Sequence, residues 1–284
     1  MVIPGLIFVM AAILTGYTIA GGKVGAIVQP AEFITILGAS IGAMIVSSPM
    51  KLLKQIVAAF IGALKGGHKF DKECYLELLA VMFQFFSLAR KQGLLALEPH
   101  VSDPHKSEIL VKYPKLLHNK AGMEFLIESL RLVIDGSVQA EELEQLLDSS
   151  LETHKAESHM PTSVLTKVGD SLPGIGIVGA VLGIIITMGH IDGPPSEVGH
   201  HVAAALVGTL LGVFFSYCVI NPITASIELG HQEEEKYLEV IKTGLLSFVN
   251  GATPGTAIEY ARRTIFSFDR PNQQETEKAC KNPR

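Results

Sequence analysis

Four long apolar runs, arranged as two pairs, dominate the hydropathy pattern of this 284-residue chain. The runs cover roughly Val2–Ala20, Phe33–Met50, Leu172–Gly189 and Val202–Ile227. Each is long enough to cross about 30 Å of hydrocarbon as a helix. None has Asp, Glu, Lys, Arg or His in its interior. The pattern therefore predicts an all-α integral membrane protein with four transmembrane helices in a 2 + 2 arrangement.

The polar segments show helical patterns of their own, with apolar residues three and four positions apart. We expect helices over Asp71–Glu98, Gly122–Ile134 and Val138–His154, and a further helix over Ile227–Val249 that continues from the fourth run. The predicted organisation is residues 1–50 (two spans and an outer loop at about 21–32), 51–170 (a cytoplasmic helical domain), 171–227 (two spans and an outer loop at about 190–201) and 228–284 (a cytoplasmic helix and tail).

The remaining composition excludes several classes of protein. The net charge of −5 is small and scattered, which argues against nucleic-acid binding. The three cysteines are far apart, so they indicate neither a disulfide framework nor a metal site. Phosphate-loop, zinc-protease, nucleophile-elbow and dinucleotide motifs are absent from the sequence. We therefore expect no enzyme activity and no cofactor. The first run lacks a basic leader and is longer than a signal peptide core, so we expect it to stay as a span.

The distribution of positive charge predicts the orientation. Of the 23 Lys and Arg residues, 14 lie in 51–170 and 8 follow residue 227, whereas the two short loops contain Lys23 alone. Positive residues near the ends of spans stay on the cytoplasmic side. Both termini and the central segment are therefore predicted to be cytoplasmic.

Small residues four apart give each run a face on which another helix backbone can approach closely. They are Ala12, Gly16 and Ala20; Gly38 and Gly42; Gly179 and Gly183; and Ala204, Gly208 and Gly212. These faces could pack within the chain, but their presence on all four runs favours further helices from an oligomer or a partner.

Two prolines and two charged residues stand out, each with an ordinary explanation. We expect Pro173 to open the third span, where a missing N–H costs little. Pro222 falls inside a helix that continues past it, so it is either a static bend or a hinge. Arg90 and Glu98 lie about two turns apart near one face of the helix predicted at Asp71–Glu98. Charges at a helix end are usually solvated surface.

Several stretches together resemble the MotA family of flagellar motor stator subunits, within the MotA/TolQ/ExbB proton channel superfamily. They are GDSLPGIGIVGAVLGIIITMG (Gly169–Gly189), QPAEFITILGASIGA (Gln29–Ala43), VGTLLG (Val207–Gly212) and NGATPGTAIEYARRT with a following DRP (Asn250–Thr264, Asp269–Pro271). The resemblance runs over essentially the whole chain, and the 2 + 2 arrangement fits it. ExbB and TolQ subunits share the logic of the last two spans but have three spans.

The resemblance implies a bacterial inner-membrane protein in which five copies surround a MotB dimer. MotB would supply the membrane Asp, and ion flow would be coupled to torque on the rotor protein FliG. Arg90 and Glu98 match the family's rotor contacts, and Pro173 and Pro222 match its paired coupling prolines. Because an acid at mid-membrane is costly and marks ion pathways, and the interiors of the runs contain none, we expect the relay carboxylate to come from another chain.

The choice of ion follows from two positions of the resemblance. Sodium-driven relatives carry Thr where this chain has Ala180, and another Thr matching Thr209, often after a Thr that is Gly208 here. Missing hydroxyls remove ligands that a dehydrated sodium ion needs, so we expect protons. The alternatives are a sodium-driven stator subunit, an ExbB/TolQ-type energising subunit, and a carrier or membrane scaffold. A carrier would have interrupted half-helices or a polar midplane site.

Overall fold

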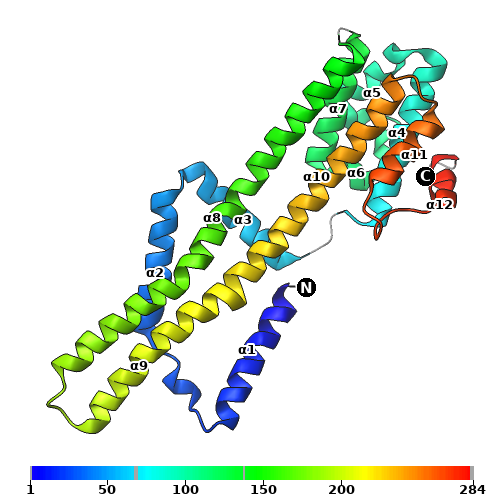
Figure 1. The fold of residues 1–284 in the computed structure, drawn as a ribbon. Coiled ribbons are helices and arrows are strands. Elements are labelled where there is room, and N and C mark those ends of the chain that lie inside the picture. Colours follow the sequence, from blue (N-terminus) through cyan, green and yellow to red (C-terminus); the bar gives the residue numbers. More distant parts are fainter. Residues whose placement is uncertain (1, 67–69, 137, 282–284) are drawn as a thin grey trace. The chain divides into compact units, whose positions relative to one another are not determined.

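The computed structural model describes residues 2–66, 70–136 and 138–281, and the regular structure among them is helical (Figure 1). The α-helices are α1 (Val2–Ile19), α2 (Pro30–Ser47), α3 (Met50–Lys65), α4 (Lys72–Gln92), α5 (Glu98–Ser102), α6 (Pro114–His118), α7 (Lys120–Asp135), α8 (Ala140–Gly189), α9 (Pro195–Phe214), α10 (Asn221–Val249), α11 (Pro254–Thr264) and α12 (Gln273–Lys281). Short 3₁₀ turns lie at Val24–Ala26, Leu94–Leu97, Pro104–Lys106 and Leu110–Lys112, and a π-helical segment covers Phe215–Ile220.

The chain divides into two compact units. Unit one comprises Met1–Gly67 and Ser158–Leu229, and unit two comprises His68–Glu157 and Gly230–Arg284. Among the described residues, four helical stretches are long and apolar enough to cross a membrane: Val2–Ile19, Pro30–Ser47, Ala140–Gly189 and Pro195–Val249. These stretches correspond to the four apolar runs. The confirmed part of the fold prediction is an all-helical chain with apolar helices of spanning length.

Unit one is held together by close contact between α8 and α9. A methyl group added at Gly176 would come within 2.9 Å of the Gly208 carbonyl, and one added at Gly212 would come within 2.7 Å of the Leu172 carbonyl. The small residues therefore let two backbones touch, as glycine does in membrane helix pairs. Ile36 of α2 is fully buried against this pair.

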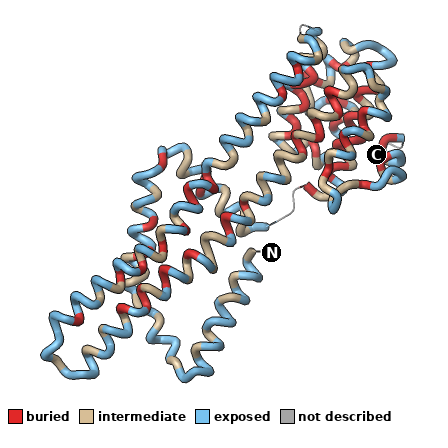
Figure 2. The backbone as a smooth tube through the Cα atoms, viewed as in Figure 1, coloured by how far each residue is buried: buried red, intermediate tan, exposed pale blue. Residues whose placement is uncertain are grey.

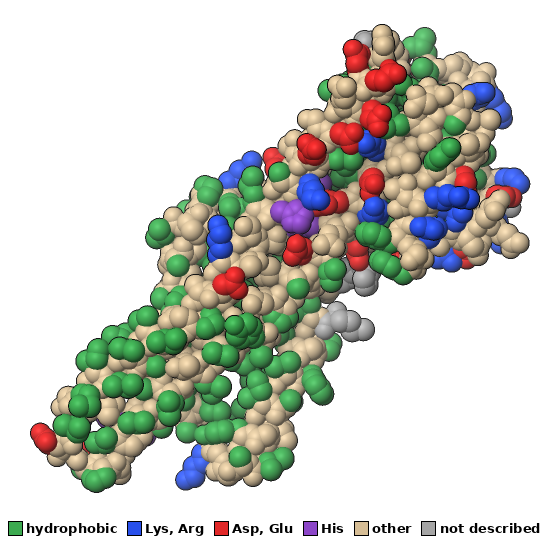
Figure 3. Space-filling view, in the orientation of Figure 1, with side chains coloured by type: hydrophobic (Ala, Val, Ile, Leu, Met, Phe, Trp, Pro, Cys, Tyr) green, Lys and Arg blue, Asp and Glu red, His purple; other side chains and the backbone are tan. Residues whose placement is uncertain are grey.

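Helix α1 contributes little to this packing. None of its residues is buried, and Figure 2 shows the helix in exposed and intermediate colours along its length. Phe8 and Ile19 are 75% and 82% exposed. In the space-filling view, hydrophobic side chains cover much of the visible surface of unit one, whereas charged side chains gather on unit two (Figure 3). An apolar surface of this extent is what a lipid-facing or subunit-facing helix presents.

Unit two has a conventional hydrophobic core centred on α4. Tyr75, Leu78 and Phe85 of α4 are at most 1% exposed, and Phe86 stacks on Phe248 of α10 with ring centroids 4.5 Å apart. Tyr237 of α10 is fully buried beside Tyr75. Helices α11 and α12 pack on α4. This core fixes the surface loops that carry the charged candidate residues.

Local capping explains where the helices of unit two begin. The side chain of Asp71 accepts a hydrogen bond from the Cys74 N–H at 2.8 Å, and Asn119 accepts one from Gly122 at 3.1 Å. Both are N-caps that satisfy an amide without a helical partner. Gly136 ends α7 in the left-handed conformation.

The helix predicted over Asp71–Glu98 is shorter than expected. Helix α4 ends at Gln92, and Gly93 has a φ of 88°, a conformation that favours glycine. A 3₁₀ turn follows, and Glu98 opens the separate helix α5. Arg90 and Glu98 therefore lie on different helices, and the prediction that one helix carries both was wrong.

The expected role of Pro173 was also wrong. Helix α8 is a single helix of 50 residues with Pro161 and Pro173 in its interior, so Pro173 is not in the first turn of a helix. The sequence pattern was misleading because the polar helix and the apolar run join without a break. Each interior proline removes one backbone hydrogen bond from α8.

Candidate ion pathway and coupling site

A carboxylate lies where α2 meets α8 and α9. Glu32 is in the first turn of α2, not in the preceding outer loop as expected. Its Oε2 atom is buried and has no hydrogen-bond partner among the described residues. A methyl group added at either Gly179 or Gly208 would come within 2.5 Å of this atom. The Glu32 carboxylate therefore fills space that exists because both positions are glycine.

Of the positions considered for ion choice, Gly208 adjoins this carboxylate, and Ala180 and Thr209 lie near Gly208. Ala180 follows Gly179 in α8, and its backbone nitrogen would lie 3.2 Å from a methyl group at Gly208. Thr209 follows Gly208 in α9 and is partly exposed. In unit one, Ala180 and Thr209 are thus the sequence neighbours of the two glycines, Gly179 and Gly208, that adjoin the Glu32 carboxylate. A carboxylate oxygen that is buried without a hydrogen-bond partner is costly in an apolar setting.

Glu32 was missed because the apolar run was taken to start at Phe33. A usable signal was present, since Pro30 is a residue typical of a first helical turn. A helix that starts at Pro30 places Glu32 on its first turn, where a carboxylate also interacts favourably with the helix dipole.

For the stator subunit that the resemblance implies, we expect Glu32→Gln to slow rotation mainly at low load. The change keeps the side-chain shape and removes a charge that can concentrate cations, an effect worth about tenfold in rate or more. The measurement is the rotation speed of small and large beads attached to filaments. Low-load speed should fall severalfold while high-load torque changes less.

The matched control is Glu197→Gln, because Glu197 is an exposed acid in the first turn of α9. This variant should rotate like the wild type. Equal low-load speeds for wild type and Glu32→Gln would contradict a role for Glu32 in ion access.

The backbone around Pro222 is irregular on its N-terminal side. The segment Phe215–Ile220 is π-helical, and the Asn221 N–H donates to the Ser216 carbonyl five residues earlier. Proline has no N–H to donate and its ring clashes with the carbonyl four residues back, so a wider turn relieves the contact. Ser216 is fully buried in this segment, and its hydroxyl has no partner among the described residues.

Pro173 of α8 lies near the same part of unit one as Pro222. The Asn221 side chain packs on Gly169 of α8, four residues before Pro173. Pro173 is half-buried and Pro222 is exposed. The prolines thus lie on neighbouring helices, each with a local defect in its hydrogen bonding. Thr187, in contrast, donates to its own helix at the Gly183 carbonyl at 2.8 Å, which is the ordinary state of a threonine in a span.

The two predicted rotor contacts are on the surface of unit two. Arg90 lies in the last turn of α4 and Glu98 in the first turn of α5, and both are exposed. Gly93 lies between them and turns the chain. Buried neighbours such as Ala89 and Leu97 anchor the backbone on both sides. Two opposite charges are thereby presented from a fixed turn.

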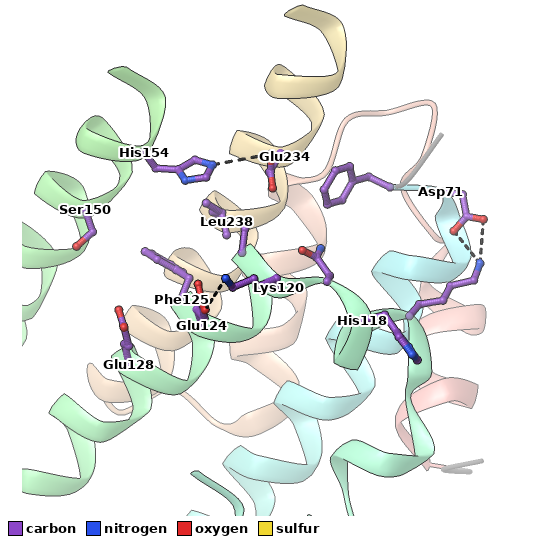
Figure 4. A pocket seen from close by; sticks show the side chains of 14 residues that line it. Asp71, His118, Lys120, Glu124, Phe125, Glu128, Ser150, His154, Glu234 and Leu238 are labelled. Carbon is purple, nitrogen blue, oxygen red and sulfur yellow. Dashed lines mark hydrogen bonds and ion pairs between the residues drawn. The ribbon is translucent and has the colours of Figure 1, made fainter. Parts of the chain in front are cut away.

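Unit two also has a hollow of about 790 Å³ lined by residues of α6, α7, α8 and α10 and by Phe70 and Asp71, which precede α4. Figure 4 shows its side chains, with His154 3.9 Å from Glu234 and Lys120 3.7 Å from Glu124. Lys115 is held at 2.9 Å from Asp71, and its hydrogen bonds to Glu73 and Asp71 raise the pKa of Lys115. The predicted site residues lie outside this hollow. A group of metal-ligating side chains is not found among the described residues.

The motif at Asn250–Thr264 has a structural role. Gly251 turns the chain with a φ of 91°, and Thr253 caps α11. Arg262 donates to the Glu259 carboxylate at 2.8 Å and to the Pro271 carbonyl at 3.0 Å. The hydrogen bonds from Arg262, and then from Arg263, lower the pKa of Glu259 to about 2.

Comparison with known proteins shows which family the chain resembles. Residues 3–93 match the family model "Motility protein A N-terminal", and residues 118–240 match "MotA/TolQ/ExbB proton channel family". Motility protein A of Escherichia coli is 37% identical over 286 residues, covering 100% of this chain and 97% of that protein. Chemotaxis protein LafT of Vibrio parahaemolyticus is 35% identical, covering 96% of each chain.

Solved structures have the same fold. The structure described as the flagellar MotAB stator complex from Bacillus subtilis aligns with a TM-score of 0.74 at 27% identity, covering 90% of this chain and 92% of that one. The C. jejuni MotAB structure aligns with a TM-score of 0.79 at 20% identity, covering 96% and 98%. The second match concerns the fold alone.

The fold, the apolar helices and the acid beside α8 and α9 define a membrane-spanning helical subunit of the proton channel class. The chain belongs to the Motility protein A family, and it is a subunit of the flagellar motor stator. This role is not enzymatic.

Proposed function

We propose that this chain is the proton-driven, torque-generating subunit of a stator in the bacterial inner membrane. Its four apolar helices span the bilayer as two pairs, with both termini and the polar helices of 51–170 and 228–284 in the cytoplasm. The observation that carries the proposal is the full-length similarity to Motility protein A, at 37% identity. The charge distribution supports the orientation, because Lys23 is the single basic residue in the two short loops.

The proposed partner is a MotB-type chain that contributes the membrane Asp, with five copies of this chain around two of the partner. The related structures are described as MotAB complexes. Unit one also leaves surface for such contacts. A methyl group added at Gly16, Gly38 or Gly42 would meet no atom within 4 Å. These faces of α1 and α2 are therefore not covered by other parts of the chain. By contrast, Gly183 packs on Ala205 within the chain.

Protons are the ion that this pathway favours. A threonine at 208 would require the Glu32 carboxylate to move, because its Cβ would come within 2.5 Å of Oε2. A carboxylate can pass a single proton, whereas sodium needs several oxygen ligands at once. Ala180 offers none, and Thr209 offers one hydroxyl. The sodium-driven alternative would need these ligands from the partner.

The proposed rotor contact on FliG uses Arg90 and Glu98. Both side chains are exposed on opposite sides of the Gly93 turn, which suits electrostatic steering and register. We expect Arg90→Glu or Glu98→Lys to reduce swimming by roughly half or more. Reversing a charge replaces an attraction of about 1 kcal/mol with a similar repulsion. The measurement is torque per stator unit, with membrane levels determined on the same cells.

Suitable controls are Lys120→Glu and Glu128→Lys, two exposed charges on α7 of the same unit. These should leave torque unchanged. Normal swimming of both Arg90→Glu and Glu98→Lys would rule out the rotor contact, as would a loss of motility that merely follows a loss of protein.

Deletion of the gene tests the function as a whole. We expect paralysed cells that still assemble flagella, with swimming restored by the wild-type gene. Intact swimming together with loss of iron or toxin uptake would favour the ExbB/TolQ-type alternative. The neighbouring gene gives a second check, since a one-span protein with a membrane Asp is expected there.

A further inference from the structure

Helix α3 has a composition unlike that of its neighbours. It begins at Met50, directly after Ser48 and Pro49, which follow the second apolar helix. Its sequence, MKLLKQIVAAFIGALK, contains three lysines and no acidic residue. At 100° per residue, Lys51, Lys54 and Lys65 fall within an arc of about 60°. The lysines are therefore on one stripe of the helix.

One face of α3 is bound to unit one. Ile56 is 2% exposed and belongs to a cluster with Val164 and Leu165 of α8 and Ile223 and Ile227 of α10. Leu52, Ala59, Phe60, Ala63 and Leu64 pack around the same cluster. The helix thus has a fixed rotation in which the stripe of lysines faces away from this cluster, and all three lysines are exposed.

A second apolar strip on α3 has no cover within the chain. Met50, Val57 and Ile61 are 69%, 51% and 46% exposed. At 100° per residue these three side chains fall within an arc of about 40°, directly beside Lys54 and Lys65. An exposed apolar strip flanked by lysines is typical of a helix lying in the interface of a membrane, with its apolar side among acyl chains.

We propose that α3 binds anionic phospholipid, with Met50, Val57 and Ile61 among the acyl chains and the three lysines on the headgroup phosphates. Charge complementarity selects this occupant, because α3 has no acidic residue and its lysines form no ion pair among the described residues. Continuity with α2 selects the bilayer, since two residues separate the helices. The inference rests on the membrane topology given under the proposed function.

The test is native mass spectrometry of the purified full-length chain, titrated with phosphatidylglycerol or phosphatidylcholine. The wild type should prefer phosphatidylglycerol. Each of Lys51→Gln, Lys54→Gln and Lys65→Gln should reduce that preference by about fivefold, as expected for a basic residue near an anionic surface. The combined Met50→Ser, Val57→Ser and Ile61→Ser variant should bind both lipids more weakly and keep the ratio between them.

The matched control replaces Lys106, Lys112 and Lys120, three exposed lysines of unit two, with Gln. This variant should keep the wild-type preference. An unchanged preference in all three α3 lysine variants would overturn the proposal. The proposal would also be overturned if the serine variant of the apolar strip changed the number of chains per particle while lipid binding stayed as in the wild type. The strip would then be a contact between copies of the chain. Lipid binding is read without motility, so its failure is distinct from failure of the stator function.

Discussion

Gly212→Ala is expected to remove most of the chain from the membrane fraction, although it adds a single methyl group. That methyl would lie 2.7 Å from the Leu172 carbonyl and 2.8 Å from the Gly176 Cα. Both neighbours are backbone atoms, so α8 and α9 must separate. Overpacking of this kind costs about 1–3 kcal/mol, and a loss of 1–2 kcal/mol changes abundance severalfold. The measurements are membrane levels and the melting temperature in detergent.

Gly174→Ala is the matched control. Gly174 lies two residues from Gly176 in α8, and an added methyl would meet nothing within 4 Å. Alanine is also the better helix former by about 1 kcal/mol. This variant should be as stable as the wild type or slightly more so. Equal losses at positions 174 and 212 would show that the contact between α8 and α9 is not the cause.

Pro222→Ala is expected to lower torque severalfold while leaving the protein at least as stable. Alanine restores the backbone donor and removes the ring clash, a gain that can reach about 3 kcal/mol in a helix interior. The π-helical turn at Phe215–Ile220 should then relax towards a regular α-helix. If this irregular turn lets α10 move relative to α9, making it regular stiffens the joint. Rotation speed under load, together with membrane levels, measures the effect.

Pro161→Ala provides the comparison, because Pro161 is another proline in a helix interior, on α8. It should affect torque much less. A Pro222→Ala motor that turns at wild-type speed under load would show that Pro222 is a static bend. A parallel loss of protein and torque would show a role in folding.

The sequence was informative where hydrophobic pattern alone decides the structure. Four runs without internal charge predicted four apolar helices of spanning length, and the structure has them. The end of the helix predicted over Gly122–Ile134, to within one residue, and the end of the long helix at Val249 were also predicted correctly. Each depends on local signals, namely glycine in a left-handed or turn conformation.

The errors came from features that require tertiary context. Pro173 resembled a helix start because proline is common there, but the preceding polar helix runs directly into the apolar run. Helix α4 ends before Gly93, whose backbone has a φ of 88°. The pattern of apolar residues continues past this glycine, so the pattern did not predict the end of the helix. Glu32 was assigned to a loop because the start of the helix at Pro30 was missed, and its contact with Gly179 and Gly208 depends on how the helices pack.

The sequence did not show which of the four stripes of small residues pack within the chain and which are left uncovered. Those of α8 and α9 meet neighbours within the chain, as Gly183 does at Ala205 and Gly212 does at Gly176. Those of α1 and α2 are open, as at Gly16 and Gly38. Spacing of four residues predicts that a backbone can approach, but the identity of the approaching helix depends on the fold.

Proton flux into liposomes tests the central idea, which is that the relay acid of the membrane pathway comes from a second chain. Purified protein is reconstituted alone and with its one-span partner, and acidification of a trapped dye is followed under a potassium gradient. The account predicts no flux through this chain alone, because Glu32 lies at one end of α2 and the interiors of the four apolar runs contain no acid. Flux should appear when the partner is added, and an added protonophore should confirm that the vesicles are sealed. Proton flux through this chain alone would contradict the account.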